Sequence, residues 1–174
     1  MRYMFKARDI ALWFIYKTNA EIKEHVAVND DYEVYEGITH LKLQKLLYFA
    51  QGVTLSMLDG KKIFDEKIIA WEHGPVIKEV YDIYRNNGRN YLEIDLSEEN
   101  NKIISDIESN IEISKILNLV YDNFAIYTAW QLRDMTHEKG APWDITVKSS
   151  GPNTEIKTEI IKKYFDENVV EQNG

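Results

Sequence analysis

Two histidine–glutamate pairs are the residues of this chain whose types suggest chemistry. They are Glu72-His73, in the stretch AWEHGPV, and His137-Glu138, in the stretch LRDMTHEKGAPW. An imidazole beside a carboxylate can ligate a metal ion or transfer a proton. Neither histidine has a second histidine at the spacing that puts two ligands on one helix face. A metal- or His/Glu-dependent hydrolase therefore requires the two stretches to meet in space; otherwise the imidazoles are structural and hydrogen-bond the two turns.

The sequence contains no other motif for catalysis or for cofactor binding. It has no cysteine, which excludes thiolate ligands, thiol nucleophiles and redox switches. It has no Gly-x-Ser-x-Gly elbow and no Gly-x-x-x-x-Gly-Lys phosphate loop. The carboxylates are spread over the predicted solvent faces of helices, and no pair stands out. We therefore expect a protein that is not an enzyme and that needs no cofactor or metal.

Length and charge limit the classes of partner. A chain of 174 residues fits one domain, which would cover residues 1–174, be ordered to about residue 168 and end in an acidic tail. Lys and Arg number 21 against 29 Asp and Glu, a net charge of −8, which disfavours phosphate backbones and favours a basic partner. A nucleic-acid regulator would need a basic face within this acidic total. No apolar run approaches the roughly 20 residues of a membrane span, and residues 1–6 lack a signal-peptide stretch, so we expect a cytoplasmic protein.

The spacing of apolar residues predicts a mainly α fold, a single compact helical domain with a small β-hairpin. Short β-branched and aromatic runs at residues 63–64 and 68–71 predict the hairpin. Gly74-Pro75 then indicates a tight turn that opens the third helix, and residues 28–37 indicate a loop. We expect helices over residues 8–24, 39–58, 76–87, 98–124 (continuous or broken near residues 109–110) and 128–139, and from about residue 153.

The second of these helices has the strongest apolar pattern and one polar flank. Gln44, Tyr48 and Gln51 share this flank at spacings of three and four residues. The flank is either a polar network at the margin of the core, where such groups pair with backbone, or a stripe that binds a partner.

The aromatic content, four tryptophans and eleven tyrosines, allows two interpretations as well. Most of these side chains are expected to fill the core. Trp130, with Leu132 and Met135, is expected on the apolar side of the helix that begins at Thr128. A minority of aromatic residues is expected at an interface, where Trp and Tyr give a large contact area.

Four ordered blocks of the sequence resemble the Panacea domain, which occurs in SocA-like antitoxins and in phage-associated proteins. They cover nearly the whole chain and are residues 39–52 (THLKLQKLLYFAQG), 70–76 (AWEHGPV), 132–143 (LRDMTHEKGAPW) and 156–165. Some relatives carry an added DNA-binding domain before these blocks, and we expect this chain to differ from them in lacking one. Its stretch from Glu98 to Asn118 is also longer than is usual in the family. We therefore expect no autoregulation of its own promoter and a toxin-facing surface that differs from that of its relatives.

The resemblance implies a noncatalytic antitoxin of a toxin–antitoxin system. Such a protein is encoded beside a toxin, often in phage or prophage, binds it and neutralises it. At least one branch of the family delivers its toxin to a cytoplasmic AAA+ protease as an adaptor. Members face unrelated toxins, so the shared blocks describe a scaffold and do not name the partner.

Two groups of residues are therefore the candidates for a role in this function. The first group is expected to build the scaffold, with the histidines bonding the turns and the indoles packing beneath them: Trp71, His73, Gly74, Pro75, His137, Pro142 and Trp143. The second group presents polar heads beside apolar surface, as an adaptable interface does, and is expected to bind the partner: Gln44, Lys45, Tyr48, Gln51, Tyr81 and Arg85.

Overall fold

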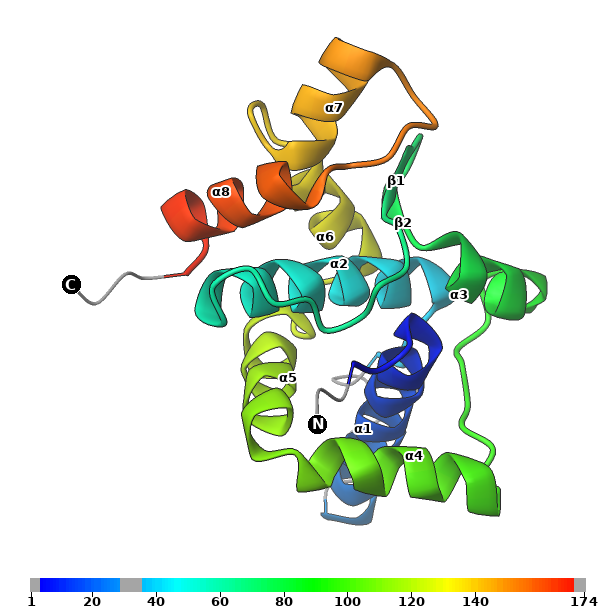
Figure 1. Cartoon of the computed structure of the whole chain (residues 1–174). Coiled ribbons are helices and arrows are strands. Elements are labelled where there is room, and N and C mark those ends of the chain that lie inside the picture. The colour runs from blue at the N-terminus through cyan, green and yellow to red at the C-terminus, as the bar shows by residue number, and fades with distance from the viewer. Residues whose placement is uncertain (1–3, 29–35, 171–174) are drawn as a thin grey trace.

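The computed structural model describes residues 4–28 and 36–170, and this part of the chain is mainly α with a small antiparallel sheet (Figure 1). The predicted fold class is therefore confirmed. The predicted loop at residues 28–37 and the acidic tail fall largely or partly outside the described residues. None of the helices in the described ranges is long and apolar enough to span a membrane.

The elements in chain order are α1 (Ala7–Val28), α2 (His40–Met57), β1 (Ile69–Trp71), β2 (Gly74–Val76), α3 (Lys78–Tyr84), the 3-10 turn η1 (Arg85–Asn87), α4 (Glu98–Ser109), α5 (Ile111–Phe124), α6 (Ala129–Thr136), α7 (Pro142–Ser150) and α8 (Thr158–Asn168).

Helix α2 is the centre of the fold. The Thr39 hydroxyl caps it by accepting from the Lys42 backbone N–H, as its sequence predicts. Every residue from Lys42 to Leu55 is buried, because α6, α8 and the hairpin cover one side of the helix and α1 and α5 the other (Figure 1). Helix α8 comes so close that a Cβ on Gly52 would lie 2.3 Å from the Phe165 ring. Polar side chains on α2 must therefore find partners inside the protein.

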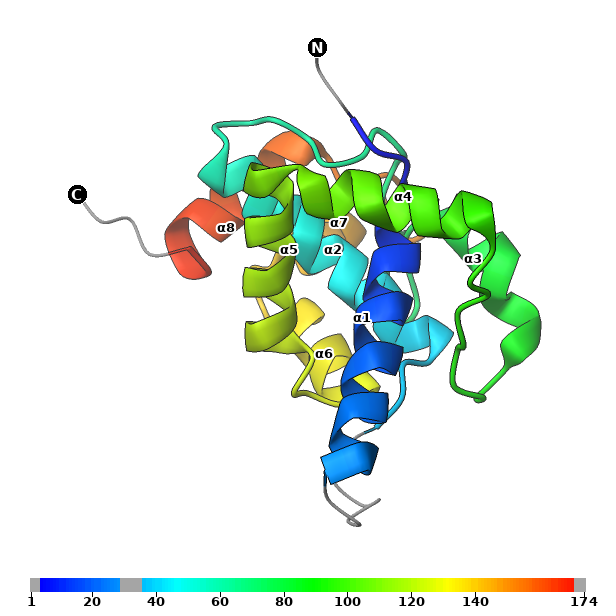
Figure 2. The same ribbon diagram turned by 90° about the horizontal axis from the view of Figure 1, so that it is seen from below.

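Helices α4 and α5 form a corner beneath α1 and α2 (Figure 2). The chain has two helices here because the Asn110 side chain accepts from the Ile113 backbone N–H and so caps α5. Ser97 caps α4 in the same way, through the Asn100 backbone N–H. Sequence had left open the choice between one helix and two, and Asn110 decides it.

The hairpin differs from the predicted one. β1 pairs with β2, with Ile69 opposite Val76 and Trp71 opposite Gly74, so Gly74-Pro75 is a strand segment and does not begin α3. Residues 63–64 are buried but are not a strand in the structure. Their backbone is bonded instead by the Gln51 amide, which accepts from Ile63 N at 2.9 Å and donates to the Phe64 carbonyl at 2.8 Å.

The C-terminal part holds two further differences. No helix is predicted between residues 139 and 153, but the structure has α7 there, and Pro142 occupies its first turn, where a missing N–H costs nothing. The last helix begins at Thr158 rather than near 153, because the preceding residues run beside β1. Ala70 N donates to the Thr154 carbonyl and Ile156 N to the Ile68 carbonyl, both at 2.8 Å.

Candidate functional site

The two histidine-bearing stretches meet through His137. This residue caps the C-terminus of α6, and its Nδ1 lies 2.8 Å from the Arg133 carbonyl. Its Nε2 lies 3.0 Å from the backbone carbonyl of Glu72, in the hairpin turn. A neutral imidazole can donate to one of these carbonyls, and an imidazolium can donate to both. His137 therefore joins α6 to the hairpin through backbone atoms and not through the Glu72 carboxylate.

Trp143 makes a second bond to the hairpin. Its Nε1 donates to the Trp71 carbonyl at 2.7 Å, and its ring lies against that of His137 with centroids 3.8 Å apart. The turn before α7 is closed by Gly140 N, which donates to Asp144 Oδ2 at 2.9 Å. This backbone bond, with help from Lys148, lowers the pKa of Asp144. The hydrogen bond between Gly140 and Asp144 thus fixes the start of α7 and with it the position of the Trp143 indole.

Lys45 makes the third bond, from α2. Its Nζ donates to the Pro75 carbonyl at 3.1 Å, and the residue is 0% exposed. Burial, with the Arg133 guanidinium nearby, lowers the pKa of Lys45 to about 7. Gly74 has φ of +105°, and a Cβ there would lie 2.8 Å from Thr136 Oγ1 and 3.2 Å from Lys45 Nζ. The hairpin therefore needs glycine at this position to pack on α2 and α6.

The expected partner-binding flank on α2 is buried, which corrects its predicted placement. Gln44 forms a clamp on Ile77, accepting from its N–H at 2.8 Å and donating to its carbonyl at 3.1 Å, as Gln51 does at residues 63–64. Tyr48 is 1% exposed, and burial raises its pKa well above the usual value. The structure therefore places four of these side chains at the margin of the core: Gln44, Lys45, Tyr48 and Gln51. The sequence alone does not reveal their burial, because they are covered by α8 and the hairpin, which lie far from α2 in the sequence. Partner binding stays a prediction for Tyr81, which is half-buried against Trp71, and for the exposed Arg85.

Comparison with known proteins shows to which family this chain belongs. The family model for the SocA-like antitoxin Panacea domain matches residues 43–144, which include most of α2, the hairpin, α6 and the start of α7. Antitoxin SocA of Caulobacter vibrioides (strain NA1000 / CB15N) is 31% identical over 138 residues, which cover 74% of this chain and 70% of that protein. The chain belongs to the SocA-like Panacea family. No solved structure matches it.

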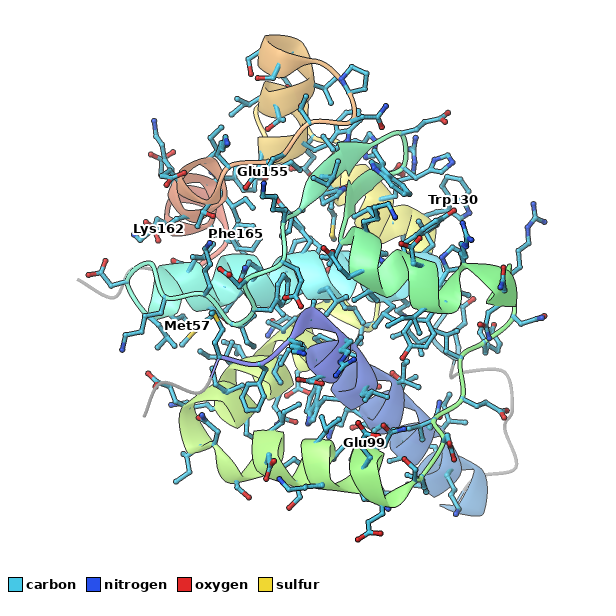
Figure 3. All side chains as sticks on the ribbon, turned by 45° about the vertical axis from the view of Figure 1, so that its right-hand side comes forward. Met57, Glu99, Trp130, Glu155, Lys162 and Phe165 are labelled. Carbon is cyan, nitrogen blue, oxygen red and sulfur yellow. The ribbon has the colours of Figure 1, made fainter. Side chains whose placement is uncertain are left out.

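The Panacea blocks also leave side chains on the surface. His73, expected to bond the hairpin turn, is exposed, and its ring lies edge-on to Trp130 with centroids 5.9 Å apart. Trp130 is 59% exposed beside the hairpin (Figure 3), which corrects its predicted place on the apolar side of α6. At 100° per residue, Trp130 lies about 160° from the buried Leu132 around the helix axis. The spacing of Trp130 and Leu132 in the sequence is therefore a signal that could have predicted the exposure of Trp130.

The described residues contain no group of three or more His, Asp or Glu side chains that could hold a metal ion. Trp71, Gly74, Pro75, His137, Pro142 and Trp143 of the Panacea blocks come together at one junction of α2, α6, α7 and the hairpin. Their hydrogen bonds go mainly to backbone carbonyls. The arrangement can hold a hairpin rigidly and present the side chains of its turn.

Proposed function

We propose that this Panacea-family chain is an antitoxin that neutralises a cognate toxin by binding it directly, without catalysis. The observation that carries the proposal is the similarity to Antitoxin SocA over most of both chains. The geometry supports a binding role, because both His137 nitrogens face backbone carbonyls and the glutamates beside the two histidines are exposed. A rigid junction with exposed aromatic side chains is suited to contact with another protein.

The test is expression of the chain with the product of its neighbouring gene. We expect that product alone to stop growth, and growth to return when this chain is co-expressed. Affinity purification of the tagged chain should then recover both proteins as one complex. Rescue without a complex would contradict direct binding, and a neighbouring product that is not toxic would contradict the antitoxin role.

Neutralisation can proceed by occlusion or by delivery of the toxin to a AAA+ protease, as a branch of the family implies. The half-life of the tagged toxin after synthesis is stopped separates the two modes. A half-life shortened by this chain, and restored in a strain lacking the protease, indicates an adaptor. An unchanged or longer half-life together with growth rescue indicates inhibition by binding alone, which is the mode that we propose.

A further inference from the structure

A pocket of about 310 Å³ lies beside α2, between the ends of α5, α6 and α8, and we name it the Tyr164 pocket. Its deepest part is formed by Tyr48 and Phe49 of α2, which are 1% and 5% exposed. The rest of the lining comes from the other three helices and from residues just after them: Phe124, Met135, Glu138, Tyr164, Asn168 and Val169. This volume is at the lower end of the range for ligand sites. The pocket therefore suits one long side chain better than a large cofactor.

Aromatic rings form most of the wall of the Tyr164 pocket. Phe49 and Phe124 stack with ring centroids 4.1 Å apart, and the Tyr48 ring meets that of Phe49 edge-on. Phe124 and Tyr164 are only partly buried, so a bound group can reach them. The face of an aromatic ring carries negative charge density and attracts cations, most strongly where water is partly excluded. This wall therefore favours a cation with an apolar stem.

The one charged side chain in the lining of this pocket is the carboxylate of Glu138. Glu138 is exposed, and its side chain accepts from the Tyr164 hydroxyl at 3.5 Å, which is the limit of a hydrogen bond. It forms no ion pair within the part of the chain that the structure describes. Burial, with the charge of Glu138 nearby, raises the pKa of Tyr164. The carboxylate thus acts on the pocket and has room for a cationic partner.

The end of α8 adds to the negative potential at the pocket. The last turn of this helix contains no basic residue that would offset the negative end of the helix dipole. Asn168, the last residue of α8, lines the pocket. Outside the lining, Glu167 and Lys163 lie one turn apart on α8 and offset each other. The helix end and Glu138 therefore determine the sign of the local charge.

Basic side chains on the neighbouring segments do not fill this pocket. Lys42 donates to the Ala125 carbonyl at 2.6 Å, and Lys162 pairs with Asp166 at 2.7 Å. Lys139 is exposed and is not part of the lining. The chain as a whole carries a net charge of −8, which attracts a basic partner from a distance. Both the local and the total charge therefore favour a cation from another molecule.

The Panacea junction holds Glu138 in place. This residue directly follows His137, whose two ring nitrogens face the carbonyls of Arg133 and Glu72. Its own backbone carbonyl accepts from Ala141 N at 3.0 Å and so closes the turn before α7. A group on a backbone that is already fixed loses little entropy on binding. In the His-Glu pair of the motif, the imidazole thus belongs to the frame and the carboxylate faces the pocket.

We propose that the Tyr164 pocket is where the toxin docks, and that it takes an arginine side chain from a basic segment of the toxin. The guanidinium pairs with the Glu138 carboxylate, and the stem of the arginine lies against the rings of Phe124 and Tyr164. Arginine suits the pocket better than lysine, because its planar head stacks on aromatic rings and matches both oxygens of a carboxylate. This proposal rests on the proposed antitoxin function and names the surface that performs it.

The first test removes the charge of the pocket. Glu138→Gln keeps the shape of the side chain, and it should weaken binding to the toxin by at least about 10-fold in calorimetry with purified proteins, with a matching loss of growth rescue. Glu112→Gln is the matched control, because Glu112 is exposed at the start of α5, at the opposite end of that helix from Phe124. It should bind as the unmodified chain does.

The second test fills the pocket with a cation from this chain. Asn168 is exposed at the last position of α8, where a lysine is favourable to the helix dipole. Asn168→Lys should therefore unfold at the same temperature as the unmodified chain or higher, yet bind the toxin at least about 10-fold more weakly. Asn86→Lys adds the same charge on η1, which follows α3 on the opposite side of the molecule from the end of α8 (Figure 1), and should bind normally. A binding loss in a chain that is no less stable cannot be a folding defect.

The third test needs no toxin. Butylguanidinium reproduces the arginine side chain, and butylurea has nearly the same shape without the charge. In an NMR titration of the free chain, butylguanidinium should give saturable shifts at Phe124, Met135 and Tyr164, at concentrations at least about 10-fold lower than butylurea. These shifts should be lost in Glu138→Gln and kept in Glu112→Gln.

The outcomes separate the two proposals. If the unmodified, folded chain neither rescues growth nor binds the toxin, the proposed function fails, and the docking inference fails with it. If it does both but Glu138→Gln and Asn168→Lys bind normally, only the docking inference fails. Loss of binding in both variants, with normal binding by both controls, supports both proposals.

Three further results would overturn the assignment of the occupant. Stronger toxin binding by Asn168→Lys would show that the docking segment is acidic. Equal binding of butylguanidinium and butylurea would show that the pocket does not recognise a guanidinium. If light scattering shows that the free chain is a dimer and that Asn168→Lys is a monomer, the pocket holds a second copy of this chain.

Discussion

Lys45 allows a quantitative prediction, because a charged amine is costly where no water reaches it. The side chain is 0% exposed, and its hydrogen bond is to the Pro75 carbonyl. Its pKa falls from 10.5 to about 7 in the folded protein. We predict that Lys45→Met, which keeps an unbranched side chain only one atom shorter and removes the amine, changes how stability depends on pH.

The direction in which the free energy of unfolding changes with pH follows from the proton that is taken up on unfolding. Between pH 7 and pH 10.5 the folded protein holds Lys45 mostly neutral, whereas the unfolded chain holds it protonated, so unfolding takes up a proton. The free energy of unfolding of the unmodified chain should therefore rise with pH in this window. At about 1.4 kcal/mol per pH unit, the full shift corresponds to roughly 5 kcal/mol of destabilisation at low pH. From pH 7 to pH 9 the gain is about 2 kcal/mol, and below about pH 6 the contribution is constant.

The assay is urea unfolding of the unmodified chain and of Lys45→Met at pH 5, 6, 7, 8 and 9. Other titrations largely cancel in the difference between the two proteins. We expect this difference to shift by about 2 kcal/mol in favour of the unmodified chain from pH 7 to pH 9. Lys61→Met, at an exposed position, is the control and should show a constant difference. A constant difference for Lys45→Met as well would show that the amine keeps its ordinary pKa and would refute the argument.

Three further predictions concern the packing around α2 and the hairpin, and urea unfolding tests each. His137→Ala should lower the free energy of unfolding by about 1–3 kcal/mol because it removes bonds to two carbonyls, whereas His73→Ala, at an exposed ring, should change it by less than about 0.5 kcal/mol. If both variants fold normally yet lose toxin neutralisation, the structural role of His137 is wrong. Gln44→Leu should cost about 1–3 kcal/mol, since it leaves the buried N–H of Ile77 unpaired, whereas the Ile77 carbonyl keeps its bond from the Tyr81 N–H; no loss would mean that water replaces the amide. Gly52→Ala should cost about 1–3 kcal/mol because its Cβ would overlap the Phe165 ring, and a neutral effect would show that α8 can move away.

Local signals in the sequence predicted much of the fold. The capping box at Thr128 and Gln131 is present in the structure with both of its hydrogen bonds. Thr39 and Ser97 cap α2 and α4, and all three helices begin within one residue of the predicted positions. These signals succeed because a cap depends on residues three positions apart. α7 is absent from the predicted helices because proline is common both just after a helix and in the first turn of a helix, so Pro142 alone does not show which of the two applies.

The hairpin could not be predicted because its hydrogen bonds are made over long distances in sequence. Pro75 lacks an N–H, and its opposite residue Ala70 bonds to the segment before α8 instead, through Asn153 N and the Thr154 carbonyl. The same limit applies to the α2 flank. Gln44 and Gln51 look alike whether they bind a partner or clamp a buried backbone, and only the positions of Ile77 and Phe64 distinguish the two roles.

A hairpin of two three-residue strands is an unusual element on which to build a protein–protein interface, because it has little stability of its own. Its geometry is determined from outside, because Lys45, His137 and Trp143 each bond one of its backbone carbonyls from a different part of the helical frame. Backbone acceptors put no demand on the identity of the side chains in the turn between the strands. Such a hairpin can therefore be held in the same position while the side chains on its outer surface differ. This separation of frame and surface is what a scaffold needs if members of one family are to face unrelated toxins.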